Sequence, residues 1–295
     1  MLPKFPEFKR LELSDQEDVE RITSKYEPYS DFDFPSMWCW DVNDNTMVSE
    51  LNGNLVAILS DHFTGTPFYS FLGNNDLDKT LKQLFAFSVH GKNSMPQLKL
   101  VPEISLEKIN LKKFLIEIDL SNYDYIYDLK KISEYTGTDF SDKRRKLNNF
   151  LKNHDNPVIK ILNLNDSADV QEILNLNDSW TAAKIKKDEG SDLKKEFIAI
   201  DRFIKAQFKG TLCVAVYVEE KLAGYAIFSV LPNSYSICHF SKGDIAHYGI
   251  YEFLLRESAT ILIEKGSTLL NYQEDLGLPG LRFWKNSFKP ISFLR

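Results

Sequence analysis

The chain has 295 residues, of which 43% are hydrophobic and 26% charged, with a formal net charge of −6. This length exceeds the size at which a single hydrophobic core usually stops growing, and the composition is that of a folded rather than a disordered protein. The negative charge argues against a DNA partner, whereas a local basic patch can still contact RNA phosphates.

The sequence predicts a cytoplasmic protein with no transmembrane segment. No stretch approaches the roughly 18 apolar residues of a membrane helix, and residues 1–6 lack the apolar core of a signal peptide. The three cysteines, Cys39, Cys213 and Cys238, form no CxxC pair. We therefore expect small buried hydrophobes rather than disulfides or a zinc site.

The first half of the chain predicts an α/β lobe. A helix is expected from Ser14, which forms a capping box with Glu17, to about Tyr26. Asn52-Gly53 between two apolar runs predicts a β-hairpin. The elements expected after the hairpin are strands over 68–72, 98–101 and 114–118, with a helix over 77–89.

The second half predicts the element order of a GNAT-type acyltransferase lobe. Helices are expected over 168–184, 192–208 and 248–265, and strands over 212–218, 222–230, 235–240 and 269–271; two helices over 128–136 and 141–153 and an apolar run over 158–162 lead to this half. The fold class expected is α/β (α+β), with two tandem GNAT-like lobes that each have a mixed, mostly antiparallel sheet flanked by helices. We place the N-terminal lobe at 1–155 and the C-terminal lobe at 156–295.

Acidic and basic residues gather just beyond the last predicted strand. Glu274 and Asp275 follow Asn271 in a glycine-containing turn, and Arg282 and Lys285 share one face of the next short helix. Glu274, Asp275 and Arg282 are candidate catalytic residues, and Asn271 and Lys285 are candidate substrate-binding residues. We expect these side chains to face an open cavity. The alternative is an ion-paired turn that locks the last strand to the last helix.

A second segment combines tyrosines with a basic helix. Its candidate substrate-binding residues are Tyr123, Tyr125, Tyr127, Lys143, Arg144, Arg145 and Asn148. Consecutive cations on an amphipathic helix are typical of a solvated face. The alternative is a contact with phosphate or the RNA backbone that weakens with salt.

These two segments, with residues 177–180 and Glu189, resemble the C-terminal domain family of bacterial phosphatidylglycerol lysyltransferases. The similar blocks are YDYIY, KRRKLNNF and NYQEDLGLPGLRFWKNSFKP. The resemblance covers most of the chain and implies a tandem GNAT-like fold related to Fem-type aminoacyltransferases. It also implies aminoacyl transfer from aminoacyl-tRNA to a small-molecule or lipid-headgroup acceptor. Trp180 would line the groove. We expect no counterpart of the membrane-embedded flippase portion of full-length lysyltransferases, which argues against a lipid acceptor.

The loop before the long helix tests the acyl-CoA alternative. CoA-dependent GNAT enzymes resemble one another there in a Q/R-x-x-G-x-G/A pattern that brings backbone N–H groups to the pyrophosphate. This chain has Gly249 in that register but Tyr251 where a small residue is needed, and Asp244 adds negative charge. Acyl-CoA is therefore disfavoured at the C-terminal lobe, and no cofactor is predicted. Asp244, Tyr248 and Gly249 are nevertheless candidate substrate-binding residues.

His239 and His247 flank this loop and are candidate general bases, with His239 also a candidate substrate-binding residue. A histidine near a strand end more often has a structural role. Three functions therefore stay open. They are an aminoacyltransferase, an acyl-CoA-dependent N-acetyltransferase, and a non-catalytic module that binds a peptide, a lipid headgroup or RNA.

Overall fold

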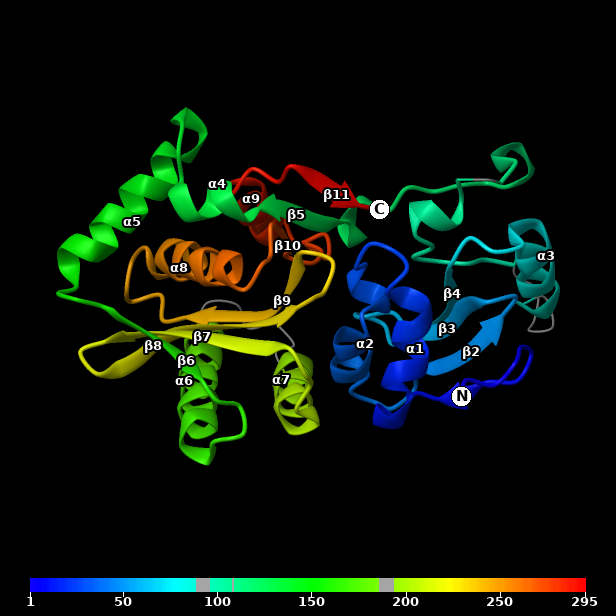
Figure 1. Cartoon of the computed structure of the whole chain (residues 1–295), viewed down its shortest axis with the longest axis horizontal. Coiled ribbons are helices and arrows are strands. Elements are labelled where there is room, and N and C mark those ends of the chain that lie inside the picture. Colours follow the sequence, from blue (N-terminus) through cyan, green and yellow to red (C-terminus); the bar gives the residue numbers. More distant parts are fainter. Residues whose placement is uncertain (89–95, 108, 186–193) are drawn as a thin grey trace. The chain divides into compact units, whose positions relative to one another are not determined.

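The computed structural model describes residues 1–88, 96–107, 109–185 and 194–295 (Figure 1). The chain divides into two units, Met1–Tyr123 with Leu294–Arg295, and Asp124–Phe293. Each unit packs helices on a β-sheet, so the predicted mixed α/β fold class is confirmed.

The first unit has a four-stranded antiparallel sheet in the order β1-β2-β3-β4. Its strands and helices are β1 (Lys9–Arg10), α1 (Gln16–Thr23), α2 (Phe34–Trp40), β2 (Met47–Leu51), β3 (Asn54–Ser60), β4 (Pro67–Leu72) and α3 (Leu77–Ser88). The predicted hairpin is β2–β3, and Asn52 and Gly53 have φ angles of 53° and 82°. Two consecutive positive φ angles are what a type I′ turn requires.

The start of the first helix differs from the prediction. The capping box joins Glu12 and Asp15 around a 3₁₀ turn over Leu13–Asp15, and α1 follows directly and ends at Thr23. The Asp15 carboxylate accepts the backbone N–H of Glu12 at 3.0 Å, which starts the turn two residues before Ser14. The predicted box of Ser14 and Glu17 is therefore wrong.

Two strands predicted late in the first unit are not formed. Residues 98–101 contribute one isolated bridge, between Leu98 and Tyr69. Residues 114–118 run outside any sheet of the described chain, and Leu115 is 87% exposed. The apolar, β-prone pattern predicted a strand, but a strand also needs a partner edge, which a local pattern does not reveal.

The second unit has a seven-stranded mixed sheet in the order β11-β5-β10-β9-β8-β7-β6, in which β10 and β9 run parallel. Its strands are β5 (Asp124–Asp128), β6 (Val158–Leu162), β7 (Thr211–Val218), β8 (Lys221–Val230), β9 (Tyr235–Gly243), β10 (Leu269–Asn271) and β11 (Ser292–Leu294). Its helices are α4 (Leu129–Glu134), α5 (Ser141–Asn153), α6 (Ser167–Ile185), α7 (Lys194–Ala206), α8 (Ile250–Glu264) and α9 (Pro279–Asn286).

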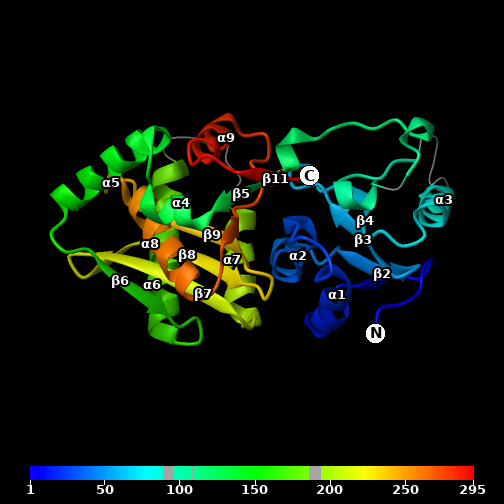
Figure 2. The same cartoon turned by 45° about the horizontal axis from the view of Figure 1, so that its top comes forward.

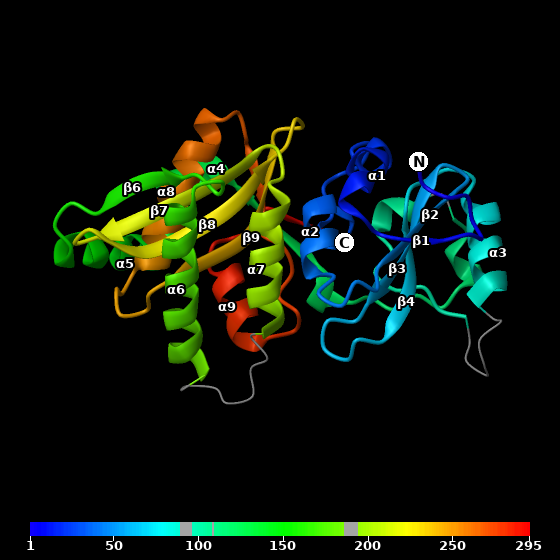
Figure 3. The same cartoon turned by 90° about the horizontal axis from the view of Figure 1, so that it is seen from below.

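The helices of the second unit cover both faces of its sheet. Helix α8 lies on one face, accompanied by α4 and α5 (Figures 1 and 2). Helices α6 and α7 lie side by side on the other face (Figure 3). The core between the sheet and α8 includes Tyr127, Val214, Phe228, Phe253 and Leu270. All three cysteines are buried free thiols, as predicted.

The boundary between the units lies at Tyr123–Asp124, well before the predicted 155–156 boundary. Strand β5 pairs with β10, so that Ile126 lies opposite Asn271, and α4 and α5 pack against α8. These contacts join residues that are 109 to 150 positions apart, whereas sequence periodicity reports only local structure. Among the described helices, none combines the length and the apolar character needed to cross a membrane.

Candidate active site

The loop after β10 is held in one conformation by Asp275. Its Oδ1 accepts the backbone N–H of Gly277 at 2.8 Å and Nη2 of Arg282 at 2.9 Å, and its Oδ2 accepts Nε of Arg282 at 2.8 Å. The Tyr125 hydroxyl donates to the same Oδ2 at 2.6 Å. The Asp275 side chain is 0% exposed and that of Arg282 is 41% exposed.

The pKa values of Asp275 and Tyr125 are shifted in the directions that these hydrogen bonds and their burial predict. Burial raises the pKa of Asp275, but the hydrogen bonds from Arg282 and Tyr125 outweigh burial and hold it below its usual value. Burial and the neighbouring carboxylate raise the pKa of Tyr125 to about 12. Asp275 is therefore an ionised and fully coordinated carboxylate, and Tyr125 is a neutral phenol that donates to it.

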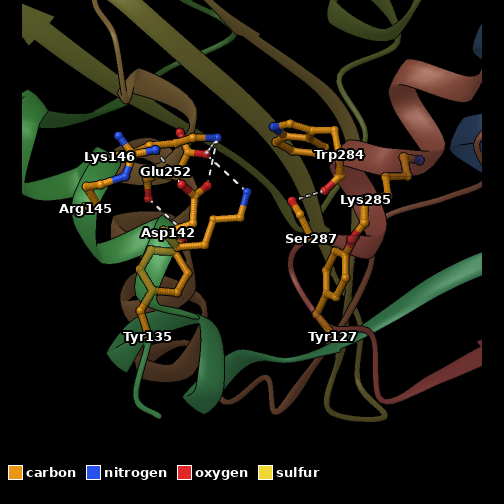
Figure 4. A network of polar contacts seen from close by, with 10 residues as sticks. Tyr127, Tyr135, Asp142, Arg145, Lys146, Glu252, Trp284, Lys285 and Ser287 are labelled. Atoms are coloured by element: carbon orange, nitrogen blue, oxygen red, sulfur yellow. Dashed lines mark hydrogen bonds and ion pairs between the residues drawn. The ribbon is translucent and has the colours of Figure 1, made fainter. Parts of the chain in front are cut away.

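Lys285 fastens the same loop from the other side. Its buried ammonium donates to the backbone carbonyls of Tyr272, at 2.6 Å, Gln273, at 3.1 Å, and Glu274. Burial lowers the pKa of Lys285. The Tyr127 hydroxyl donates to the Lys285 carbonyl at 2.8 Å (Figure 4). All three donors of this ammonium are thus used inside the protein.

The expectation that this cluster faces an open cavity is not met for its buried members. Asp275 and Lys285 are sealed by their partners, and buried Asn271 donates to Asp124 at 2.9 Å and accepts Gln273 N–H at 2.7 Å. Their geometry matches the structural alternative, a lock between the last strand and the last helix. Glu274 and Arg282 keep partly exposed side chains.

The basic helix α5 also turns much of its charge inward. Lys143 is 1% exposed, and its ammonium lies 3.2 Å from the Glu252 carboxylate and 3.5 Å from the centre of the Phe288 ring. Burial lowers the pKa of Lys143. Arg144 donates to the carbonyls of Tyr135 and Gly137. These two cations have structural partners, which differs from the predicted phosphate contact.

The outer side of α5 carries the remaining predicted residues. Arg145 is exposed and pairs with Asp142 at 2.6 Å, and Asn148 is exposed. Tyr123 belongs to the first unit, where the Arg295 guanidinium lies 5.8 Å from its ring centre. Tyr123 is therefore separated from Tyr125 by the boundary between the units.

Gly249 is required by packing rather than by a ligand. Its φ is +95°, and an added Cβ would lie 2.3 Å from the carbonyl oxygen of Lys146 in α5. Asp244 accepts the backbone N–H of Ala246 at 2.9 Å, and Tyr248 is exposed. The loop before α8 is thus shaped by its own hydrogen bonds and by α5.

Of the two candidate histidines, His239 lacks the environment of a general base. His239 is buried, with Nε2 2.8 Å from the Ser229 hydroxyl and its ring against Phe203, and burial lowers the pKa of His239 to about 3. His247 Nδ1 lies 3.3 Å from His154 Nε2. A base with such a low pKa is weak near pH 7, so His239 is better explained as a core residue.

A different cluster lies at the carboxyl end of β9. The Lys242 ammonium is buried against the face of Trp180, 3.6 Å from the ring centre, and pairs with Glu196 at 2.6 Å. The Tyr251 hydroxyl accepts Nε1–H of Trp180 at 3.2 Å and the backbone N–H of Gly243 at 3.1 Å. Helices α6, α7 and α8 thereby meet at the end of one strand.

The aromatic side chains of α9 and β10 continue this cluster. Trp284 lies 6.0 Å from Tyr251 and 5.6 Å from Tyr272, measured between ring centres. Of the predicted substrate-binding residues, Trp180 is the one that this aromatic cluster includes. Lys242 and Glu196 were missed, because local sequence does not reveal that α6 and α7 converge on β9. Glu189, another residue of the predicted pattern, lies outside the described residues.

Strand β9, beside this cluster, continues past the end of its pairing with β10. The pairing of β9 with β10 covers Tyr235, Ser236 and Ile237, opposite Leu269–Asn271. Beyond these residues β9 continues to Gly243, and a bulge against β8 leaves His239 as the extra residue. Strand β9 therefore extends six residues past its pairing with β10, toward Trp180 and Tyr251.

Solved structures share this fold. A conserved protein of unknown function from Bacteroides thetaiotaomicron VPI-5482 superposes with a TM-score of 0.80, at 22% identity, over 100% of this chain and 97% of its own. A C-terminal domain assigned to a lysylphosphatidylglycerol synthetase of Agrobacterium fabrum gives 0.59, at 13% identity, over 94% and 89%. L-PGS from Bacillus licheniformis gives 0.58, at 12% identity, over 100% and 91%.

The sequence comparisons agree with the structural ones. An uncharacterised protein of Mycoplasmoides gallisepticum (strain R(low / passage 15 / clone 2)) is 27% identical over 190 residues, which are 63% of this chain and 59% of that protein. The chain thus spans less than two thirds of the length of that relative. The family model described as "Phosphatidylglycerol lysyltransferase, C-terminal" matches residues 24–295. The chain belongs to the family of the phosphatidylglycerol lysyltransferase C-terminal domain.

Proposed function

We propose that the chain transfers an aminoacyl or related acyl group to an amine or hydroxyl acceptor, and that the reaction takes place at the carboxyl end of β9. Membership of the lysyltransferase family supports the reaction class. The observation that carries the location is the cluster of Trp180, Lys242, Tyr251 and Trp284 at the part of β9 that extends beyond its pairing with β10. The donor proposed is aminoacyl-tRNA, and the acceptor a lipid headgroup or a peptide.

The chemistry is an acyl transfer between two oxygen or nitrogen nucleophiles. The acceptor amine or hydroxyl attacks the ester carbonyl of the donor, the ester C–O bond breaks, and the departing hydroxyl takes up the proton. The charge that develops on the carbonyl oxygen needs donors that are already in place. The buried Lys242 ammonium, held by Trp180 and Glu196, is a positive charge already in place at this end of β9.

Lys242 and its neighbours would orient the donor. An ammonium held between an aromatic face and a carboxylate has little freedom to move, so its field is fixed in direction. Tyr251 ties the indole of Trp180 to the end of β9, and Trp284 adds a flat apolar surface. Flat rings of this kind suit stacking with a nucleobase.

The acyl-CoA alternative is disfavoured by the packing at Gly249, which brings α5 against the start of α8. The second candidate function is a non-catalytic binding module. It is favoured by Asp275 and Lys285, because these predicted site residues use their polar atoms for bonds inside the protein and leave none for catalysis at the loop after β10. The aminoacyltransferase and the binding module differ in one measurable respect, because a binding module forms no acylated product.

The deciding experiment incubates the purified protein with radiolabelled aminoacyl-tRNAs and a panel of acceptors. The panel contains vesicles with phosphatidylglycerol and a mixture of peptides. We expect labelled product with at least one pair, and expect Lys242→Met to remove it, because methionine keeps the packing on Trp180 but lacks the charge. Lys221→Met, at an exposed position, is the matched control and should retain activity. Absence of product with every pair would refute the transferase proposal.

A further inference from the structure

A cavity of about 120 Å³ lies in the second unit at the start of β7. It is formed by the loop between β6 and α6, by the end of α7 with the residues that follow it, and by the first residues of β7. Thr211 pairs with Ser229 of β8, and Ser229 pairs with Ile237 of β9. The cavity therefore lies beside the start of β9, whereas Lys242 lies near the other end of that strand.

The floor of the cavity is apolar and uncharged. Leu162, Phe203, Phe208 and Cys213 line it and are buried. The rings of Phe203 and Phe208 meet edge to face, with ring centres 5.3 Å apart. Burial raises the pKa of the Cys213 thiol, so this side chain stays neutral near pH 7. Such a floor favours an apolar group, and its two aromatic rings favour a flat one.

The rim of the cavity is polar. The side chains of Asn163, Asn165 and Gln207 are exposed, and Thr211 is half-buried. Amide and hydroxyl groups both donate and accept hydrogen bonds. Among the described residues that line the cavity, none carries a charge. A charged ligand would lose hydration here without gaining a counter-charge, so the lining favours a neutral ligand.

Hydrogen bonds hold the walls of the cavity in place. The Asp169 carboxylate, in the first turn of α6, accepts the backbone N–H of Asn163 at 2.7 Å. The side-chain carbonyl of Asn163 accepts the backbone N–H of Asn165 at 3.0 Å. The Thr211 hydroxyl donates to the Phe208 carbonyl at 2.8 Å, which leaves the hydroxyl oxygen able to accept. Walls that are formed before a ligand arrives lower the entropy lost on binding.

The volume of the cavity matches a ligand of one ring. A cavity of about 150 Å³ lined by aliphatic and aromatic side chains binds benzene. The cavity at β7 is of similar size but has a polar rim, so it suits a ring that carries a hydrogen-bonding group. Water can bond to the rim, but it gains no hydrogen bonds from the buried rings of Phe203 and Phe208.

We propose that this cavity is a binding site for a small neutral ligand that consists of one ring and an amide group. The ring packs on Phe203 and Phe208, and the amide bonds to Gln207 and Thr211 at the rim. Phe203 also packs on His239 of β9, with ring centres 4.7 Å apart, so the signals of His239 report occupancy. The site is separate from the cluster at the other end of β9, and the inference therefore does not depend on the proposed function.

The direct test is NMR titration of the purified chain with benzamide, followed through the backbone amides. We expect saturable shifts at Asn163, Asn165, Thr211 and Cys213, with a Kd of about 1 mM or lower. Benzoate has nearly the same shape but carries a charge, and it should bind about tenfold more weakly or worse. No saturation with benzamide, shifts confined to other parts of the chain, or equal binding of the two probes would overturn the inference.

A matched glutamine pair tests the rim. Gln207 lines the cavity, whereas Gln171 is an exposed residue of α6 outside its lining. Gln207→Ala should raise the Kd for benzamide about three- to tenfold, which is the loss expected for one hydrogen bond. Gln171→Ala should leave the Kd unchanged. Equal Kd values for the two variants would overturn the placement of the amide at this rim.

A further variant tests the floor. Cys213→Met lengthens a side chain that lines the cavity and leaves less room for a ring. Cooperative urea unfolding shows whether the variant is folded, and the folded variant should bind benzamide about tenfold more weakly or worse. Wild-type affinity in the folded variant would overturn the inference. If Cys213→Met does not fold, the glutamine pair decides the question, because both of its positions are exposed.

Discussion

Asp275→Asn is the perturbation that best separates a structural from a catalytic role for the loop after β10. The substitution keeps the size of the side chain but removes the charge that receives two hydrogen bonds from Arg282. Hydrogen bonds to buried charged groups contribute roughly 1.5–3 kcal/mol each. Because Arg282 is 41% exposed, water replaces part of what it loses. We expect the free energy of unfolding to fall by about 2–3 kcal/mol.

The pH dependence of this effect has a definite sign. The folded-state pKa of Asp275 lies below its usual value, so the ionised carboxylate contributes its stabilisation fully above about pH 4. That contribution is lost as the pH falls through the folded pKa. The difference between wild type and Asp275→Asn should therefore be largest near neutral pH and should shrink below pH 4.

The assay is urea denaturation at several pH values, with exposed Asp155→Asn as the control. Acyl transfer is then measured at a temperature where circular dichroism shows Asp275→Asn to be fully folded. A structural role predicts transfer close to the wild-type rate under that condition. A folded variant with a loss of stability below about 0.5 kcal/mol and no activity would refute the structural reasoning and restore the predicted catalytic role.

Three further outcomes follow. Tyr251→Phe should lower the transfer rate about tenfold, because it frees the Trp180 indole, and should lower the free energy of unfolding by about 1–3 kcal/mol, because the N–H groups of Trp180 and Gly243 lose their acceptor. Tyr217→Phe, which loses the contact with Glu172, should keep the wild-type transfer rate; equal rates for the two variants in a single-turnover assay would contradict this. Lys143→Met should lower the free energy of unfolding by about 3 kcal/mol, and adding Glu252→Leu should recover most of it in urea denaturation. The pKa of His239 is about 3, so its NMR titration should show no protonation between pH 5 and 8.

Much of the second unit was predictable because the local sequence of each element, its apolar pattern and its flanking turn residues, indicates a helix or a strand. The apolar runs that form β7, β8 and β9, and the turns between them, lie close to their predicted ranges. The long amphipathic helix α8 was predicted to stop at Gly266, and the structure ends it at Glu264. Local pattern and tertiary structure agree here because consecutive elements are also neighbours in the sheet.

Long-range pairing accounts for most of what the sequence did not reveal. Strand β5 contains Tyr125 and Tyr127, two of the three tyrosines that we predicted to bind substrate, but its partner β10 lies far along the chain. Pairing with β10 places the hydroxyl of Tyr125 on Asp275 and that of Tyr127 on the Lys285 carbonyl. The sequence shows that these side chains are polar or charged. It does not show that they point into the protein, because that depends on the pairing of β5 with β10, which local spacing does not encode.

The same limit applies to the candidate active site. Trp180 was expected to line a groove because of the family resemblance; in the structure its indole N–H donates to the Tyr251 hydroxyl, and the groove stays a prediction. Lys242 lies two residues beyond the predicted end of its strand. A lysine at a strand end is normally exposed, and only the convergence of α6 and α7 buries this one.

The most direct test locates the donor on the protein. Hydrogen exchange would be measured with and without a non-hydrolysable aminoacyl-adenosine, which represents the end of an aminoacyl-tRNA. Binding at the carboxyl end of β9 predicts slower exchange for the amides of Lys242, Gly243 and the first turn of α8, with α9 also protected. Protection confined to the first unit, or none at saturating analogue, would contradict the placement of acyl transfer at this cluster.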